Sequence, residues 1–154
     1  MNSVALSTGS ETNQTHISFG SVNSQGIVPN NKYNRYNFTF RNSWDVIKDV
    51  LSMDMGLFYI KQNNQNSVGQ GMYYNPLVPA YLFPPSDDIN KYVVYEMYNG
   101  SRNFKTQNWP YHNMGLGMQN PYWIVNRNMF NTDRNRNIIT LSVKWNITDW
   151  MNVI

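Results

Sequence analysis

The chain has 154 residues, a net charge of +3 and no cysteine, which excludes disulfides and thiolate metal sites. Charged residues make up only 14% and aromatic residues 15% of the chain, whereas soluble domains carry about 25% charged residues, so the composition argues against an ordinary soluble domain. Lys and Arg are scattered rather than clustered, which removes the usual basis for expecting a nucleic-acid partner.

Membrane insertion through a helix is not expected from this sequence. No apolar run approaches the roughly 20 residues of a membrane-spanning helix. The first five residues also lack the basic region and apolar stretch of a signal peptide. Insertion through β-strands stays open, because a transmembrane barrel needs only alternating segments of about 10 residues.

Alternation of apolar and polar residues with a period of two predicts an all-β chain with an antiparallel up-and-down meander of five to six strands. The clearest segment has Tyr36, Phe38 and Phe40 on one face. The predicted strands lie near residues 3–8, 15–23, 34–42, 50–61 and 136–146, with a stub at 150–154. The connections between them are 9–14, 25–31, 42–49, 62–135 and 147–149. Because the stub has only about five residues, we expect that the chain stops inside a repeating hairpin pattern.

The connection 62–135 is too long to lack structure of its own, since loops beyond about 15 residues are rare in compact domains. Two short helical pieces are predicted within it. One has its start in the stretch 86–89, Ser-Asp-Asp-Ile, with Ile89, Tyr92, Val93 and Glu96 at helical spacing. The other begins with Asn120 as cap and proline at the first helical position.

Short and long connections alternate between the two ends of the predicted meander. This asymmetry is typical of transmembrane barrels, which have short periplasmic turns and longer extracellular loops. In a barrel the apolar face meets lipid and the polar face meets the lumen. The lumen-facing candidates are Arg35, Asn37, Thr39, Arg41, Asp54 and Lys144. Alternation alone fits equally well a soluble β-sandwich, in which the apolar face packs on a second sheet.

No cluster of catalytic or metal-ligating residues is apparent, so we expect neither an enzyme nor a cofactor. His16 and His112 stand alone, and the paired acids at Asp87 and Asp88 suit a helix start. The loop aromatics either stack on sugar rings and contact a partner, or pack together as the small core of the loop. The substrate and partner candidates among them are Tyr73, Tyr74, Tyr81, Trp109, Tyr111, Tyr122 and Trp123.

Several segments resemble one known family when they are read in order. The first, "GSETNQTHISFGSVNSQGIVPNNKYNRYNFTFR", closely resembles the barrel of SusC/RagA-type TonB-linked outer-membrane transporters, with its Gly-Ile-x-Pro-Asn loop and Arg-Tyr strand start. The segments "NPLVPAYLFPPSDDINKY", "QNPYWIVNRN" and "NRNIITLSVKWNITDW" are similar to the next extracellular loop and strand. The match is collinear and covers nearly the whole chain.

The resemblance implies a piece of a 22-stranded, plugged barrel in the outer membrane of a Gram-negative bacterium. Members of the family import glycans or peptides beneath a SusD-like surface lipoprotein, with energy from the TonB complex. Since this chain shows no plug, no TonB-contacting segment and no signal peptide, we expect barrel wall and extracellular mouth rather than independent transport. The alternative is a small soluble β-module that binds carbohydrate through its loop aromatics. A complete small barrel is disfavoured, because such barrels have at least eight strands.

Overall fold

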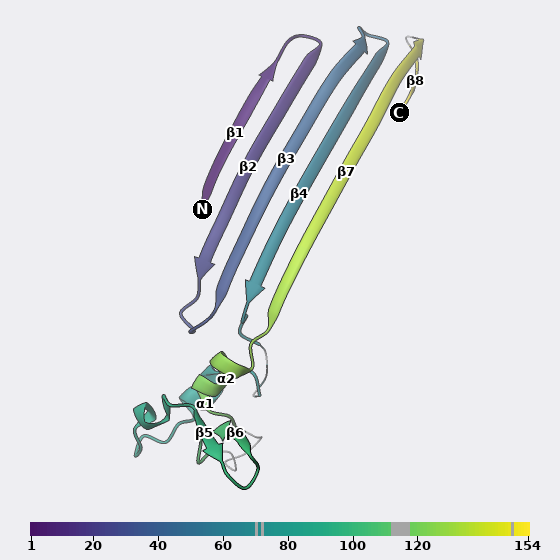
Figure 1. Ribbon diagram of the computed structural model, residues 1–154. Coiled ribbons are helices and arrows are strands. Elements are labelled where there is room, and N and C mark those ends of the chain that lie inside the picture. Colours follow the sequence, from purple (N-terminus) through teal and green to yellow (C-terminus); the bar gives the residue numbers. More distant parts are fainter. Residues whose placement is uncertain (70, 72, 112–117, 149) are drawn as a thin grey trace. The chain divides into compact units, whose positions relative to one another are not determined.

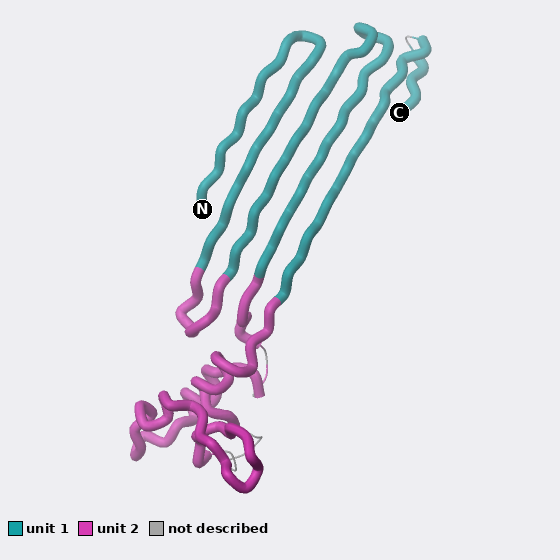
Figure 2. The backbone as a smooth tube through the Cα atoms, in the orientation of Figure 1, with its two compact units in different colours: residues 1–24, 33–63, 132–154 teal, residues 25–32, 64–131 magenta. Residues whose placement is uncertain are grey.

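The computed structural model describes residues 1–69, 71, 73–111, 118–148 and 150–154. Over these residues the chain is mostly β and divides into two compact units (Figure 2). Unit 1 comprises residues 1–24, 33–63 and 132–154, and unit 2 comprises residues 25–32 and 64–131. None of the helices in the described ranges is both long and apolar enough to cross a membrane.

Unit 1 is built on a single six-stranded antiparallel meander, which confirms that part of the predicted fold (Figure 1). Its strand order is β1-β2-β3-β4-β7-β8. Over the residues that are described, β1 and β8 form the two edges, and the sheet does not close on itself. The strands are β1 Asn2–Gly9, β2 Asn13–Gln25, β3 Lys32–Ile47, β4 Leu51–Gln65, β7 Asn131–Thr148 and β8 Met151–Val153.

The end of β3 differs from the sequence prediction, which put a connection at 42–49. The strand continues to Ile47, and a tight turn follows in which Val50 N donates to Ile47 O at 3.0 Å. Strand β3 extends this far because Ser43 and Asp45 form hydrogen bonds to residues outside it. Ser43 Oγ donates to Asp54 Oδ1 at 2.5 Å, and Asp45 N donates to Thr12 O at 2.8 Å. The other predicted reversal, at 147–149, includes Asp149, which lies outside the described residues.

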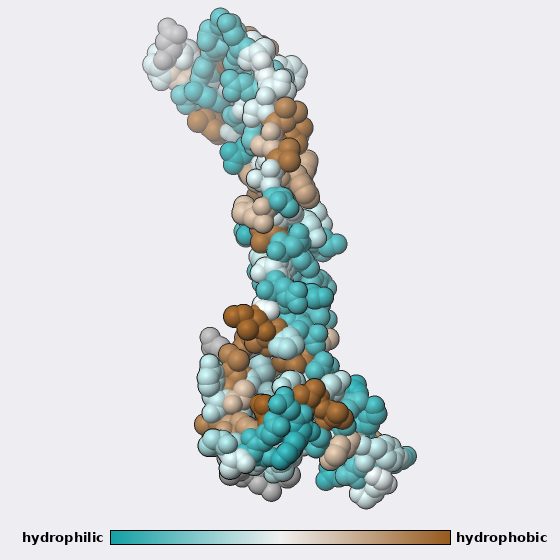
Figure 3. Space-filling model, turned by 90° about the vertical axis from the view of Figure 1, so that its left-hand side faces the viewer, coloured by the Kyte–Doolittle hydropathy of each residue, from teal (hydrophilic) through white to brown (hydrophobic). Residues whose placement is uncertain are grey.

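The two faces of the unit 1 sheet differ in polarity, as the alternation predicts. Cross-strand partners share a face, and the register of β1 on β2 sets Val4 opposite Phe19 and Leu6 opposite Ile17. These side chains are exposed, and on β7 Leu141 is 65% exposed. Viewed from the β1 side, brown apolar residues reach the surface between teal polar ones (Figure 3).

No second layer covers the apolar face within the described part of unit 1. Apart from prolines, the buried hydrophobic side chains that the structure describes all belong to unit 2: they are Trp109, Met118, Ile124 and Val125. A β-sandwich needs a second sheet that packs face to face on the first, and unit 1 by itself contains only one. Its apolar face is therefore a large exposed surface of the kind that marks contact with lipid or a partner.

Unit 2 contains the long connection, which is more structured than predicted. Its elements are α1 Leu77–Tyr81, the 3₁₀-helix η1 Ile89–Tyr92, β5 Glu96–Asn99, β6 Phe104–Gln107 and α2 Pro121–Arg127. The predicted start of α2 is confirmed, since Asn120 Oδ1 accepts a hydrogen bond from Tyr122 N at 2.8 Å. The helix predicted after Asp88 is only one turn long. Its predicted continuation to Glu96 is wrong, because Glu96 pairs with Gln107 across the β5–β6 hairpin.

The connection 25–31 also belongs to unit 2, because asparagine amides tie it to the long connection. Asn30 Nδ2 donates to Val125 O at 2.9 Å and to Asn126 Oδ1 at 3.0 Å. Asn31 Nδ2 donates to Asn66 O at 3.1 Å. Asn30 and Asn66 both have positive φ, at 63° and 52°, a conformation that Asn tolerates better than most residues. Part of the high asparagine content thus holds the two connections together.

Candidate functional site

The six lumen-facing candidates lie on the polar face of the unit 1 sheet by their position in the alternation. Arg35 Nε donates to Asn37 Oδ1 at 2.9 Å, and the Arg41 guanidinium lies 4.9 Å from the ring centroid of Phe58. Thr39 follows between them on the same strand, and Lys144 stands exposed on β7. These contacts are local, so the six residues line a face rather than converge on one site.

A shallow depression of about 420 Å³ lies on that polar face. Its lining includes Arg41, Asp54 and Gly56. A side chain at position 56 would overlap Thr140 Oγ1, so glycine is required for β4 and β7 to pack at this point. The depression is open and combines charged and hydroxyl side chains with the ring of Phe58.

The seven loop aromatics fall into two groups. Tyr73, Tyr74 and Tyr81 are exposed, and Tyr81 is 85% exposed at the end of α1. Tyr74 also packs edge-on against Phe130, with 5.3 Å between ring centroids. The remaining four are buried or half-buried within unit 2: they are Trp109, Tyr111, Tyr122 and Trp123.

An aromatic cluster forms part of the interior of unit 2. Phe83, Tyr92, Trp109 and Tyr111 lie with ring centroids 5.3–6.1 Å apart, mostly edge to face, an arrangement that aromatic pairs prefer. Trp109 is only 4% exposed. Trp109 and Tyr111 therefore contribute mainly to the core of the loop, the second of the two roles open from the sequence.

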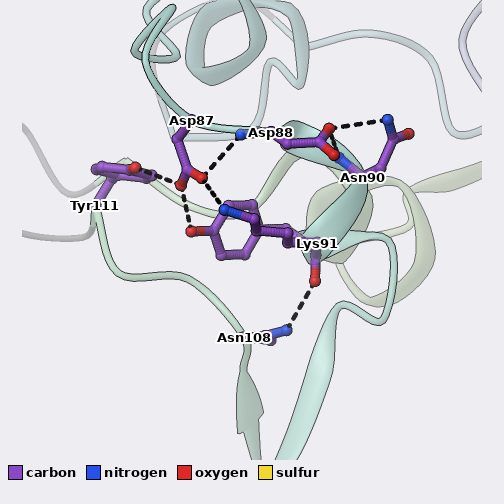
Figure 4. A network of polar contacts seen from close by, with 7 residues as sticks. Asp87, Asp88, Asn90, Lys91, Asn108 and Tyr111 are labelled. Carbon is purple, nitrogen blue, oxygen red and sulfur yellow. Dashed lines mark hydrogen bonds and ion pairs between the residues drawn. The ribbon is translucent and has the colours of Figure 1, made fainter.

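Asp87 joins the rim of this cluster through four hydrogen bonds (Figure 4). Its carboxylate accepts from Lys91 Nζ at 2.7 Å, from Tyr92 Oη at 2.6 Å and from Tyr111 Oη at 2.7 Å. The fourth donor is the Asp88 backbone N–H, at 2.8 Å. The Lys91 ammonium first, and then the two phenols, hold the pKa of Asp87 far below its usual range. The same carboxylate raises the pKa of Tyr111.

This network predicts acid sensitivity of unit 2. An unfolded Asp titrates near pH 3.9, and the folded pKa is lower. The network therefore contributes stability above about pH 4 and loses it as the pH falls toward the folded pKa. We expect the near-UV circular dichroism of the cluster to weaken progressively below pH 4. Asp87→Asn should weaken the signal already at neutral pH and flatten its pH dependence.

Asp88→Asn is the matched control for this acid titration. Asp88 Oδ1 accepts from Asn90 N at 3.0 Å and caps η1, and an Asn side chain retains that acceptor. The variant should keep the pH dependence of the wild-type chain. Equal flattening in the Asp87 and Asp88 variants would contradict the assignment to Asp87.

Asn120 is the polar centre of unit 2. Its side chain is fully buried, and its amide Nδ2 donates to Tyr92 O at 2.9 Å and Asn108 O at 2.8 Å. Its Oδ1 caps α2, and its backbone N–H donates to Gln107 Oε1 at 2.9 Å. One side chain thus joins η1, the end of the hairpin and α2, and so fixes where the hairpin lies within the unit.

The β5–β6 hairpin carries an open groove of about 540 Å³. Aromatic, cationic and amide side chains share its lining, which consists of Asn99, Arg102, Phe104, Lys105, Thr106, Gln107, Trp109 and Trp123. Phe104 is 53% exposed. The groove therefore combines ring surface with hydrogen-bond donors, as ligand sites commonly do.

Glu96 positions the cations beside this groove. Its carboxylate accepts from Lys105 Nζ at 2.6 Å and pairs with the Arg127 guanidinium. The Lys105 ammonium and then the Arg127 guanidinium lower the pKa of Glu96. Arg127 also lies 5.9 Å from the ring centroid of Trp123, so Glu96 links the hairpin to α2.

Sequence reasoning found Trp109 and Trp123 but missed Arg102, Phe104 and Lys105. A signal was present in the Asn-Gly pair at 99–100, which favours a hairpin turn between two strand-like runs. Asn99 Oδ1 indeed accepts from the backbone N–H groups of Ser101 and Arg102, at 3.1 and 3.2 Å. Recognising that turn would have placed Arg102 beside the aromatic residues.

His16 is not part of this groove: its Nδ1 lies 2.8 Å from Ser7 Oγ across the β1–β2 pair, and His112 lies outside the described residues. Among the residues with described positions, no group of three or more His, Cys, Asp and Glu side chains is arranged to hold a metal ion. The sequence matches no protein-family model and no curated protein.

Proposed function

We propose that this chain is a piece of the β-barrel wall and extracellular mouth of a TonB-dependent nutrient importer of the SusC/RagA type. In the intact protein the apolar face of unit 1 meets the lipid of the outer membrane. The polar face, with Arg35, Arg41, Asp54 and Lys144, faces the lumen or the plug. Glycan or peptide substrate enters from outside beneath a SusD-like lipoprotein, and the TonB complex supplies energy.

One observation supports the proposal above the others: a one-layer sheet with an exposed apolar face and a polar opposite face. Such a sheet is unsuited to water on both sides, because exposed apolar patches of this size mark lipid or protein contact. Strand length agrees, since β3 and β4 have 16 and 15 residues, more than the 9–11 residues that cross the hydrocarbon region. The resemblance of the chain to the transporter family supports the assignment to an importer.

The connections support an extracellular role for unit 2. In a meander, the β2–β3 and β4–β7 connections fall at the same end of the sheet, and both belong to unit 2. The β1–β2 and β3–β4 turns at the other end have three residues each, 10–12 and 48–50. Long loops on one side and short turns on the other are the pattern of outer-membrane barrels.

Purification without detergent tests the membrane part of the proposal. The open edges β1 and β8 and the apolar face should make the chain aggregate in buffer, whereas a nonionic detergent should disperse it. A size-exclusion column run under both conditions reads the difference. A monomeric, protease-resistant protein in detergent-free buffer would instead support the soluble carbohydrate-binding module.

The genomic sequence on both sides of the coding region tests the importer part. The proposal predicts an upstream segment that encodes a plug and a downstream segment that encodes further alternating strands. Flanking sequence without either one would overturn the assignment to a TonB-dependent importer.

A further inference from the structure

The groove on the β5–β6 hairpin has an excess of positive charge. Arg102 and Lys105 line it, and among the residues whose positions are described no Asp or Glu does. Glu96 beside it is shared by two cations, Lys105 and Arg127, so one positive charge of that trio is uncompensated. In the described part of the chain, Arg102 forms no ion pair. Its guanidinium is thus available to a carboxylate, to which Arg binds with two parallel hydrogen bonds.

Ring surface and amide groups lie beside those cations. Phe104 is half-exposed on β6, next to Lys105 in sequence, and the half-buried Trp123 of α2 also lines the groove. The C–H face of a pyranose packs on aromatic rings of this kind. The amide oxygens of Asn99 and Gln107 already accept backbone N–H groups, so it is their NH₂ groups that suit sugar hydroxyls. Neither the rings nor the cations alone would select one ligand class, but the combination does.

We propose that this groove binds an acidic saccharide, namely a sugar unit that carries a carboxylate. Arg102 pairs with the carboxylate, Lys105 adds a second positive charge, and Phe104 packs against the pyranose ring. The proposal narrows the substrate class of the importer and rests on that proposed function for its biological setting. Recognition itself depends only on the residues of the hairpin and of α2.

Isothermal titration of the full chain in nonionic detergent tests this proposal, with trigalacturonate and the neutral maltotriose as probes. We expect trigalacturonate to bind at least tenfold more tightly at low salt, with the preference shrinking as salt rises. Arg102→Gln should weaken trigalacturonate binding at least fivefold and leave maltotriose binding nearly unchanged. Phe104→Ala should weaken the binding of both sugars.

Lys32→Gln is the matched control, because it removes one positive charge from unit 2 at an exposed position outside the groove. It should change trigalacturonate binding less than twofold. Equal affinity for the acidic and neutral trisaccharides would overturn the proposal, as would wild-type affinity in Arg102→Gln. Tighter binding of a sulfated trisaccharide than of trigalacturonate would overturn the choice of carboxylate.

The two proposals fail in different ways. A chain that disperses only in detergent but shows no preference for trigalacturonate overturns the saccharide site and leaves the importer standing. A detergent-free monomer that prefers trigalacturonate supports the site and overturns the membrane assignment. Circular dichroism of each variant confirms that a loss of binding does not reflect loss of fold.

Discussion

Replacing Leu141 with arginine is expected to weaken transfer of the chain into lipid by about 2–4 kcal/mol, the cost of Arg at the bilayer midplane of a barrel wall. Leu141 lies on β7 and is 65% exposed on the apolar face of unit 1. The guanidinium of the new arginine would either lose its hydration or carry water molecules into the hydrocarbon. Diluting the urea-dissolved chain stepwise into phosphatidylcholine vesicles, followed by flotation, measures this transfer.

Ser142→Arg is the control, since it adds the same charge to the same strand on the opposite face. It should change the free energy of transfer into lipid by less than 1 kcal/mol, because a lumen-facing charge stays near water or polar groups. Both variants keep the same open edges, so a difference between their free energies of transfer reports which face of the sheet carries the new charge. Equal losses in the two variants would contradict a lipid-facing role for the apolar side.

Replacing Asn120 with alanine is expected to destabilise unit 2 by about 3–5 kcal/mol, the sum of a lost cap and of two backbone carbonyls that lose their donor. The carbonyls belong to Tyr92 and Asn108, and the cap accepts from Tyr122 N. The Asn120 side chain that makes these bonds is fully buried. Urea titration followed by near-UV circular dichroism of the aromatic cluster reads the change.

Two variants sharpen this test of Asn120. Asn128→Ala, at the other end of α2, removes one bond to Gln119 from a half-buried side chain and should cost about 1 kcal/mol. Asn120→Asp keeps an oxygen acceptor for the cap but turns a carboxylate toward two carbonyl oxygens. It should therefore lower the free energy of unfolding of unit 2 as much as Asn120→Ala does. A cost below 1 kcal/mol for Asn120→Ala would show that the unit is not held together at this residue.

The sequence predicted unit 1 better than unit 2 for a physical reason. Every second residue of β3 and β7 faces the same side, so apolar residues such as Phe38 and Leu141 report the strand directly. The strand end at 42–47 escaped prediction because polar residues there pair with β4 and with the β1–β2 turn rather than forming a loop. The alternation itself continues through Trp44 and Val46, but the Ser and Asp residues between them are also typical of turns.

Unit 2 depends on contacts between residues far apart in the chain, which a local pattern cannot reveal. Asn120 and Pro121 predicted the start of α2 because capping is a local interaction. By contrast, the bond between Asn30 and Val125 spans 95 residues, and the Glu96–Arg127 pair spans 31. The groove brings Trp123 of α2 beside residues of the hairpin, so its cations could not be assigned to a site from spacing.

Spin-label scanning of β7 in lipid vesicles tests the lipid-facing wall most directly. The chain has no cysteine, so single cysteines at positions 139–144 give uniquely labelled variants. With a lipid-facing wall, labels at 139, 141 and 143 should be accessible to oxygen, which concentrates in lipid. Labels at 140, 142 and 144 should be accessible to a water-soluble nickel reagent. Labels at 139, 141 and 143 shielded from both reagents, as in a protein core, or all six open to nickel, would contradict the membrane-wall account.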